Sequence, residues 1–246
     1  MERPPRRFLD ALELAELPVG SYRTNVDAVL LAAFAGARVS GSGERERRSC
    51  GHAVDLGSGV GSVGLLLLHH GVARRVTLVE VDAKAHALAE ANVIANGLES
   101  KATCVGGDVG EVSASMRGRA DLVVSNPPYF DPSRGRSPFP LRARARSGDL
   151  GRFVVAARTL AGRRARVAFV YPADATKKLF EAFHACGLEP KRMRFVHATE
   201  RRPARVVLVE AQVGKPGGLV VMPPFVERVG GKPTDELARL LRGEWV

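Results

Sequence analysis

Cysteine is scarce in this sequence, which has only Cys50, Cys104 and Cys186 among its 246 residues. The three are widely separated and form no CxxC pair, so the pattern indicates neither a disulfide framework nor a zinc site. The six histidines also lack the spacing of metal ligands. We therefore expect a protein that uses no metal.

Long apolar runs are missing as well. No stretch of 18 or more apolar residues occurs, so no membrane-spanning helix is predicted. The basic N-terminus is not followed by the apolar core of a signal peptide. We expect a cytoplasmic protein that does not bind membranes.

Acidic residues are in the minority. The chain has 26 Asp and Glu against 37 Lys and Arg, which gives a formal net charge of +11 and a pI near 10.3. Such a field attracts polyanions, so nucleic acid is the expected partner, and no obligate protein partner is evident. Thirty of the basic residues are arginine, and a coding bias toward arginine is the alternative explanation.

Strand-like and helical segments alternate from residue 53 onward. The pattern gives strands at 53–56, 76–81, 102–105, 121–125 and 166–171, and helices at 63–70, 83–96, 150–160 and 173–186. A hairpin of strands at 194–198 and 205–211 follows, then a short run at 219–222 and a last helix that Thr234 caps. Segments 40–49 and 130–147 are predicted loops. This order predicts an α/β fold with a mostly parallel sheet and its ligands at one edge.

A glycine-rich turn follows the first of these strands: Asp55-Leu56-Gly57-Ser58-Gly59-Val60-Gly61. Glycines allow the backbone to turn tightly and to approach a ligand closely. Gly59, Gly61 and Gly64 also fit the dinucleotide pattern G-x-G-x-x-G. Asp55 directly before the glycines suits a ligand with an amino group better than a pyrophosphate. A tight turn without a ligand remains the simplest alternative.

Two further carboxylates are expected at the same edge. Glu80 ends the second strand, 19 residues after Gly61, where an acid can accept both hydroxyls of a ribose. Asp82 competes for that role, but we expect it to cap the next helix. Asp108 follows the third strand and is a suitable acceptor for the amino group of an adenine.

The fourth strand is followed by Asn126-Pro127-Pro128-Tyr129. Adjacent prolines remove two backbone donors, which leaves neighbouring carbonyls free as acceptors. Asn126 adds a side-chain carbonyl and Tyr129 a flat face for stacking. Two acceptors on the hydrogens of a planar amine would stabilise the positive charge that develops at its nitrogen. The alternative is that the prolines only end an edge loop.

In these motifs the sequence resembles class I methyltransferases that act on amino nitrogens. The resemblance implies a Rossmann-like, seven-stranded sheet with helices on both faces and an antiparallel last strand. It also implies that S-adenosylmethionine is the methyl donor, S-adenosylhomocysteine the product, and Asn126 to Tyr129 the catalytic NPPY motif. The cofactor residues it implies are Asp55, Gly57, Ser58, Gly59, Gly61, Glu80 and Asp108.

The sequence is most similar to the bacterial family of tRNA adenine-N6 methyltransferases that act beside the anticodon of a valine tRNA. Its members share a segment like 22–32 and a Gly-x-x-T/S-x-E segment like 231–236. The resemblance implies methylation of N6 of an adenine in RNA. We expect residues 1–50 to fold over the cofactor side of a methyltransferase domain at 51–246. Asp27 is a candidate cofactor contact, although a plain core helix beginning near it is an alternative.

One departure from that family lies in the loop after the catalytic motif. Residues 144–149 lack a glutamate that family members often have there, which bears on the RNA target but not on methyl transfer. We expect arginines of this loop to contact phosphates: Arg134, Arg136, Arg142, Arg144 and Arg146. A second candidate patch lies near the late hairpin and contains Arg192, Arg194, Arg201, Arg202 and Arg205. Both sets also fit ordinary solvated surface.

Other functions remain open on the motifs alone. A glutamine-N5 methyltransferase of a release factor uses the same kind of motif, but such enzymes carry a substantial helical domain before the glycine turn, and only 54 residues precede Asp55 here. Methylation of rRNA or DNA remains open, because the motif binds an amino group and does not distinguish the polymer that carries it. An RNA-binding module that has lost catalysis is disfavoured because Asn126 and the glycines are present. A nicotinamide dehydrogenase would leave Asn126 to Tyr129 unexplained.

Overall fold

A mixed β-sheet forms the centre of the computed structural model, which describes residues 6–8, 12–15, 26–39, 45–128, 149–214 and 216–245. Seven of its strands follow the order β7-β6-β5-β8-β9-β11-β10. Their bounds are β5 Cys50–Leu56, β6 Ala73–Glu80, β7 Ala102–Gly106, β8 Ala120–Ser125, β9 Ala161–Pro172, β10 Leu188–Thr199 and β11 Ala204–Val213. Strand β11 is antiparallel to both β9 and β10, as the family resemblance implied for the last strand.

The sheet continues beyond β10. Strands β12 (Val220–Val221) and β13 (Phe225–Val229) both pair in parallel with β10, and β14 (Lys232–Pro233) pairs with β13. The sequence pattern predicted a short run near β12 but not β13 or β14. The sheet is therefore wider than the expected seven strands at this end.

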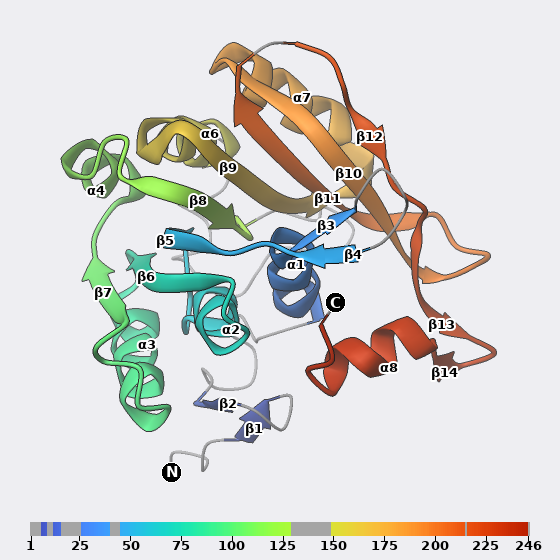
Figure 1. Cartoon of the computed structure of the whole chain (residues 1–246), viewed down its shortest axis with the longest axis horizontal. Helices are drawn as coiled ribbons and strands as arrows, with labels where there is room; N and C mark the ends of the chain where they lie inside the picture. The colour runs from blue at the N-terminus through green and yellow to red at the C-terminus, as the bar shows by residue number, and fades with distance from the viewer. Residues whose placement is uncertain are drawn as a thin grey trace.

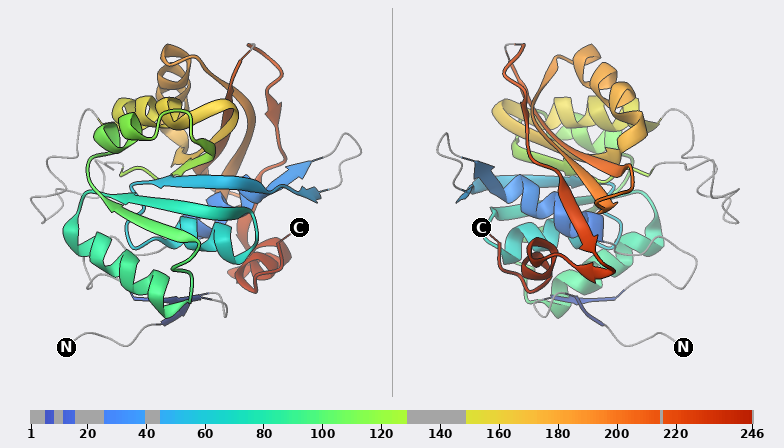
Figure 2. Two further views of the ribbon diagram at one scale, coloured as in Figure 1. Left: turned by 60° about the vertical axis from the view of Figure 1, so that its left-hand side comes forward. Right: turned by 90° about the vertical axis from the view of Figure 1, so that its right-hand side faces the viewer.

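Helices cover both faces of the sheet (Figures 1 and 2). One face carries α1 (Val26–Gly36), α2 (Ser62–His69), α3 (Ala83–Ala95) and α8 (Asp235–Leu241). The other carries α4 (Val109–Ser115), α6 (Asp149–Leu160) and α7 (Thr176–Ala185), with the short 3-10 helix η2 (Ala173–Ala175) before α7. Each layer has its own buried apolar cluster against the sheet, so the core has two halves.

Local capping explains where several helices begin. The side chain of Asp82 accepts hydrogen bonds from the backbone nitrogens of Lys84 and Ala85, which confirms the expectation that Asp82 caps α3. Thr234 accepts from the nitrogen of Leu237 and so caps α8, as predicted. The Thr234 hydroxyl also donates to the carbonyl of Val226, so the cap ties α8 to β13.

Two small hairpins lie outside the main sheet. Strand β1 (Arg6–Phe8) pairs with β2 (Leu12–Leu14), and β3 (Ala37–Val39) pairs with β4 (Arg45–Arg47). The expectation of a plain loop at 40–49 was therefore wrong for 45–47, because these residues bond to the chain that leaves α1. The predicted loop at 130–147 lies outside the described residues. In the part of the chain that is described, no helix is long and apolar enough to span a bilayer.

Candidate active site

The two principal motifs of the sequence meet at one point of the sheet. Strands β5 and β8 are parallel neighbours with Leu56 opposite Ser125, so their carboxyl ends coincide. The hydroxyl of Ser125 donates a 2.9 Å hydrogen bond to the carbonyl of Leu56. Gly57 and Asn126 are the next residues on the two strands. The glycine turn therefore starts beside the first residue of the predicted catalytic motif.

The backbone of the turn requires glycine at three positions. Gly57, Gly59 and Gly61 have φ of 67°, 57° and 88°, a region that disfavours residues with a Cβ. A Cβ on Gly57 would also lie 2.8 Å from Cε1 of Phe153 in α6. At Gly59 none of the described atoms comes within 4 Å of such a Cβ, so the described residues leave this side of the turn open. A ligand has access to the backbone there.

Glu80 supports the turn from the neighbouring strand. Its Oε2 accepts a hydrogen bond from the nitrogen of Gly59 at 2.8 Å, and its Oε1 accepts one from the nitrogen of Asp82 at the same distance. The carboxylate thus lies at the open side of the glycine turn and keeps lone pairs for further donors. This position fits the expected role of an acceptor for ribose hydroxyls.

Asp55 is nearly inaccessible, with 1% of its surface exposed. Its Oδ2 accepts a 2.9 Å hydrogen bond from the nitrogen of Gly64, in the first turn of α2. Burial raises the pKa of Asp55 to about 7, although the hydrogen bond from Gly64 acts in the opposite direction. The carboxyl group therefore fixes the start of α2 behind the glycine turn.

Asp108 and Ser58 are two further polar groups at this edge. Asp108 caps α4 through the nitrogen of Gly110 at 2.9 Å, and its other oxygen pairs with Arg152 of α6. Sequence reasoning did not anticipate Arg152, because the pair joins residues 44 positions apart. The hydroxyl oxygen of Ser58 is buried and has no hydrogen-bond partner among the described residues. Ser58 is thus available to a bound ligand.

The predicted catalytic motif is only partly described. Asn126 is half-buried, Pro127 is buried and Pro128 is exposed at the end of β8. Tyr129 lies outside the described residues, and so do Arg134, Arg136, Arg142, Arg144 and Arg146. Their expected roles stay predictions.

Asp27 lies in an ion pair near the start of α1. Its carboxylate is 2% exposed and is 2.6 Å from Arg205 of β11, which also binds Glu227 of β13. The core helix that the sequence offered as an alternative is present as α1. The structure brings Asp27 to this pair, and a cofactor contact for it stays a prediction.

Asn92 is a contributor that the sequence did not reveal. It is 1% exposed on α3 and donates a 2.9 Å hydrogen bond to the carbonyl of Val60 in the glycine turn. Its Oδ1 accepts from the nitrogen of Ala15, just after β2. One buried amide therefore joins the N-terminal hairpin, α3 and the glycine turn.

The prediction of a second phosphate-binding arginine patch near the late hairpin was wrong for three of its five residues. Arg192 is 8% exposed and bonds Glu210, Arg194 makes two hydrogen bonds to Glu236, and Arg205 is held by Asp27 and Glu227. These three guanidinium groups are engaged inside the protein, because carboxylates distant in sequence fold against them. Arg201 and Arg202 are exposed.

Comparison with known proteins agrees with this geometry. Residues 44–137 match the family described as the methyltransferase small domain. The match includes the glycine turn, Glu80, Asp108 and Asn126 to Tyr129. In the described part of this chain no group of three or more His, Cys, Asp or Glu side chains is arranged to hold a metal ion.

Two relatives and one solved structure show the range of similar proteins. A Porphyromonas gingivalis protein named tRNA1(Val) (adenine(37)-N6)-methyltransferase is 33% identical over 165 residues, which are 65% of this chain and 62% of the relative. This chain thus spans less than two thirds of that relative. A Salmonella choleraesuis protein named ribosomal RNA small subunit methyltransferase C is 35% identical over 81 residues, 33% of this chain and 22% of the relative. The crystal structure of a predicted O-methyltransferase from Agrobacterium tumefaciens has a TM-score of 0.68 at 18% identity and covers 88% of this chain and 96% of its own, which establishes the fold alone.

Proposed function

We propose that this protein transfers a methyl group from S-adenosylmethionine to N6 of an adenine in RNA. The proposed substrate is a tRNA, and the target adenine lies next to its anticodon. The observation that carries the proposal is the junction of β5 and β8, where Ser125 bonds to Leu56 and Asn126 starts beside the glycine turn. A donor held at that turn and an amine held by Asn126 are then neighbours. Alignment of the two reacting groups is the main requirement for methyl transfer.

The residues around the turn fit S-adenosylmethionine. Glu80 offers a carboxylate for the ribose, Asp108 an acceptor on the adenine side, and Ser58 a buried hydroxyl that no described residue bonds. Among the described residues, none blocks the approach to the backbone at Gly59. When bound, the cofactor supplies the methyl group as a sulfonium, so no metal is needed.

Asn126 performs the central step on the substrate side. Its side-chain oxygen and the carbonyl groups beside Pro127 accept the two hydrogens of the exocyclic amine, which favours a pyramidal nitrogen. These acceptors also stabilise the positive charge that builds on the nitrogen during transfer. Tyr129 stacks on the adenine after this base has left the RNA helix, since a base that stays stacked in the RNA cannot reach the site.

The choice of a tRNA adenine rests on similarity in sequence and on charge. The relative named for adenine(37) of a valine tRNA aligns over 65% of this chain, and the net charge of +11 favours a polyanion. The loop arginines Arg142, Arg144 and Arg146 are proposed to hold phosphates next to the target.

The test is transfer of labelled methyl groups to unmodified total tRNA, with rRNA, DNA and a release factor run in parallel. We expect N6-methyladenine in tRNA, and we expect Asn126→Ala to reduce the rate at least about a hundredfold, as for loss of one oxyanion-hole donor. Cofactor affinity of that variant should stay within about twofold, because Asn126 acts on the substrate. Label in rRNA or in the release factor would show that the proposed substrate is wrong, but it would support the proposed methyl transfer. No transfer to any of them by a protein that binds the cofactor would contradict the proposal.

A further inference from the structure

The late hairpin presents two arginines that the fold leaves exposed. Arg201 and Arg202 lie in the turn between β10 and β11, and among the described residues neither is found in an ion pair. Their neighbours Arg194 and Arg205 are neutralised by Glu236 and Glu227. The structure thus divides the basic residues of this hairpin into an internal and an external set.

The turn that carries the external set is fixed by its own hydrogen bonds. The nitrogen of Arg202 donates to the carbonyl of Thr199 at 3.2 Å. The ring of His197 donates from Nδ1 to the carbonyl of Arg202 at 2.8 Å. Because the backbone is held at both points, the two guanidinium groups project from a defined position. Little backbone entropy is then lost when they bind a partner.

The turn lies at the same edge of the sheet as Asn126. Strand β8 is parallel to β9, and β9 and β10 are each antiparallel to β11, so β10 runs in the direction of β8. Ser125 is level with Phe169, which is level with Val209, which is level with Met193. Thr199 follows Met193 by six residues along the strand.

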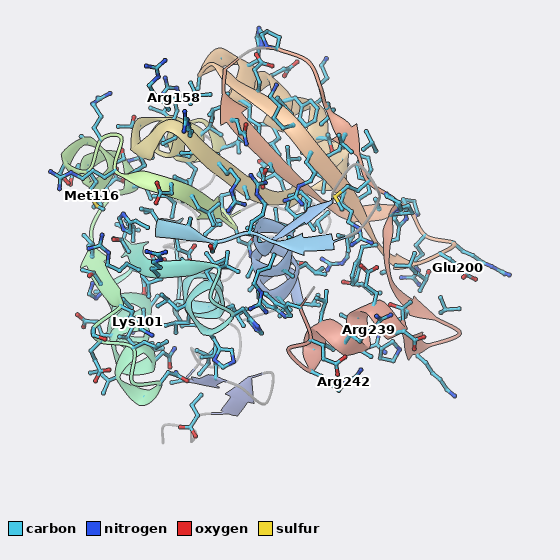
Figure 3. The ribbon with its side chains drawn as sticks, viewed as in Figure 1. Lys101, Met116, Arg158, Glu200, Arg239 and Arg242 are labelled. Carbon is cyan, nitrogen blue, oxygen red and sulfur yellow. The ribbon has the colours of Figure 1, made fainter. Side chains whose placement is uncertain are left out.

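The offset between the turn and the site follows from strand geometry. At about 3.3 Å per residue, Thr199 extends about 20 Å beyond the level of Ser125. Three strand spacings separate β8 from β10, which add about 14 Å sideways. Figure 3 shows Glu200 at the outer tip of this turn. The arginines therefore stand too far from Asn126 to touch the nucleotide being methylated.

The adjacent turn of the extended sheet adds to the positive charge. Arg228 lies opposite Thr199 on β13, and Lys232 follows on β14. Both are exposed. We call Arg201, Arg202, Arg228 and Lys232 the distal rib. Acids close to these residues in sequence are Glu200 and Asp235, which are both exposed, and Glu227, which is already bound to Arg205.

We propose that the distal rib binds backbone phosphates of the same RNA whose adenine enters the site at Asn126. The inference rests on the proposed function and adds to it the kind of substrate that is recognised. A separation on the order of 20 Å is comparable to the width of a folded RNA stem and exceeds the reach of a single nucleotide. The rib therefore selects a folded RNA, such as an intact tRNA, over a short single strand.

The first experiment measures the affinity of the full-length protein for a labelled tRNA transcript by fluorescence anisotropy at several KCl concentrations. The test variant is Arg201→Glu with Arg202→Glu. Its matched control is Arg163→Glu with Arg164→Glu, two adjacent exposed arginines near the start of β9, at the opposite edge of the sheet. We expect about tenfold weaker binding for the rib variant at 100 mM KCl and a salt slope smaller by about 1 to 2. The control should change affinity less than about threefold.

The second measurement uses a short single-stranded oligonucleotide that contains the target adenine. Its affinity should be the same for the wild-type protein and the rib variant, because it cannot reach the rib. Unchanged affinity of the rib variant for tRNA would overturn the inference, as would an equal loss in the control variant or an equal loss with the oligonucleotide. If the wild-type protein binds tRNA through the distal rib but transfers no methyl group, the proposed function is refuted. The inference that the distal rib binds RNA would still hold.

Discussion

At the scale of single residues, the site combines two carboxylates that differ in burial and in hydrogen bonding. Glu80 lies half-buried and accepts two backbone hydrogen bonds, whereas Asp55 is buried with one described bond from the nitrogen of Gly64. A carboxylate in an apolar environment is costly to ionise unless donors compensate for the lost water. Burial brings the pKa of Asp55 to about 7, so the charge of this group depends on pH near neutrality.

We predict that Asp55 makes the protein less stable as the pH rises from about 4 to about 7. The pKa of Asp55 is about 7 in the folded protein against 3.8 for an ordinary aspartate, so the unfolded chain releases this proton first. The associated stability is present below the lower value and is lost as the pH passes the higher one, up to about 4 kcal/mol. Urea unfolding of wild type and Asp55→Asn at pH 4.5 and pH 8 would show a smaller loss in the variant.

Asp121→Asn is the control for that measurement. Asp121 is an exposed carboxylate at the opposite end of the sheet that accepts hydrogen bonds from the nitrogens of Gly51 and His52. A pH dependence that is the same in wild type and Asp55→Asn would show that Asp55 is not the group responsible.

At the scale of elements, helix α1 is attached to the sheet through a buried cluster of charges. Glu210 of β11 is 3% exposed and pairs with Arg48, Arg166 and Arg192. Although burial opposes its charge, the three arginines hold the pKa of Glu210 below its ordinary value. Arg166 and Arg192 also donate to the carbonyls of Ala35 and Phe34 near the end of α1. The guanidinium groups thus satisfy carbonyls that the helix leaves unpaired.

Replacing Glu210 should therefore loosen α1 and lower the stability of the whole domain. We expect Glu210→Gln to reduce the free energy of unfolding by about 3 kcal/mol, because it leaves buried guanidinium groups without a counter-charge. Urea denaturation measures this loss. Glu244→Gln, which removes a carboxylate from an exposed pair with Arg242, is the matched control and should leave the urea midpoint unchanged. Equal midpoints for wild type and Glu210→Gln would show that the cluster does not stabilise the fold.

The elements themselves were largely foreseeable. Helix α3 begins after Asp82 and ends before Gly97, as the sequence predicted, because a capping carboxylate and a glycine act over a few residues. The antiparallel hairpin of β10 and β11 was also predicted, though both strands are longer than expected. Helix α4 and strand β13 were not predicted. Helix α4 is only seven residues long, and β13 alternates weakly and depends on β10 for its pairing.

At the scale of the whole molecule, a net charge of +11 should govern the encounter with RNA. We predict that affinity for tRNA falls by about a hundredfold or more between 50 and 200 mM KCl, because several phosphate contacts release counterions. Anisotropy titrations over this range measure the slope. Asn126→Ala should give the same slope, since its side chain is uncharged. A salt-independent affinity would mean that charge does not drive binding.

The sequence alone determined the features that depend on neighbouring residues. The glycine turn, the cap at Asp82 and the position of Asn126 at a strand end all follow from short stretches, because turn geometry and capping act within a few residues. Because strands and helices alternate and the strands are parallel, the motifs at the strand ends lie at one edge of the sheet. Tertiary structure decided which charged groups meet. Asp27 with Arg205, Asp108 with Arg152, and Arg192 with Glu210 join segments distant in sequence. Residue type and local spacing do not encode such pairs, since each partner is supplied by the packing of another element.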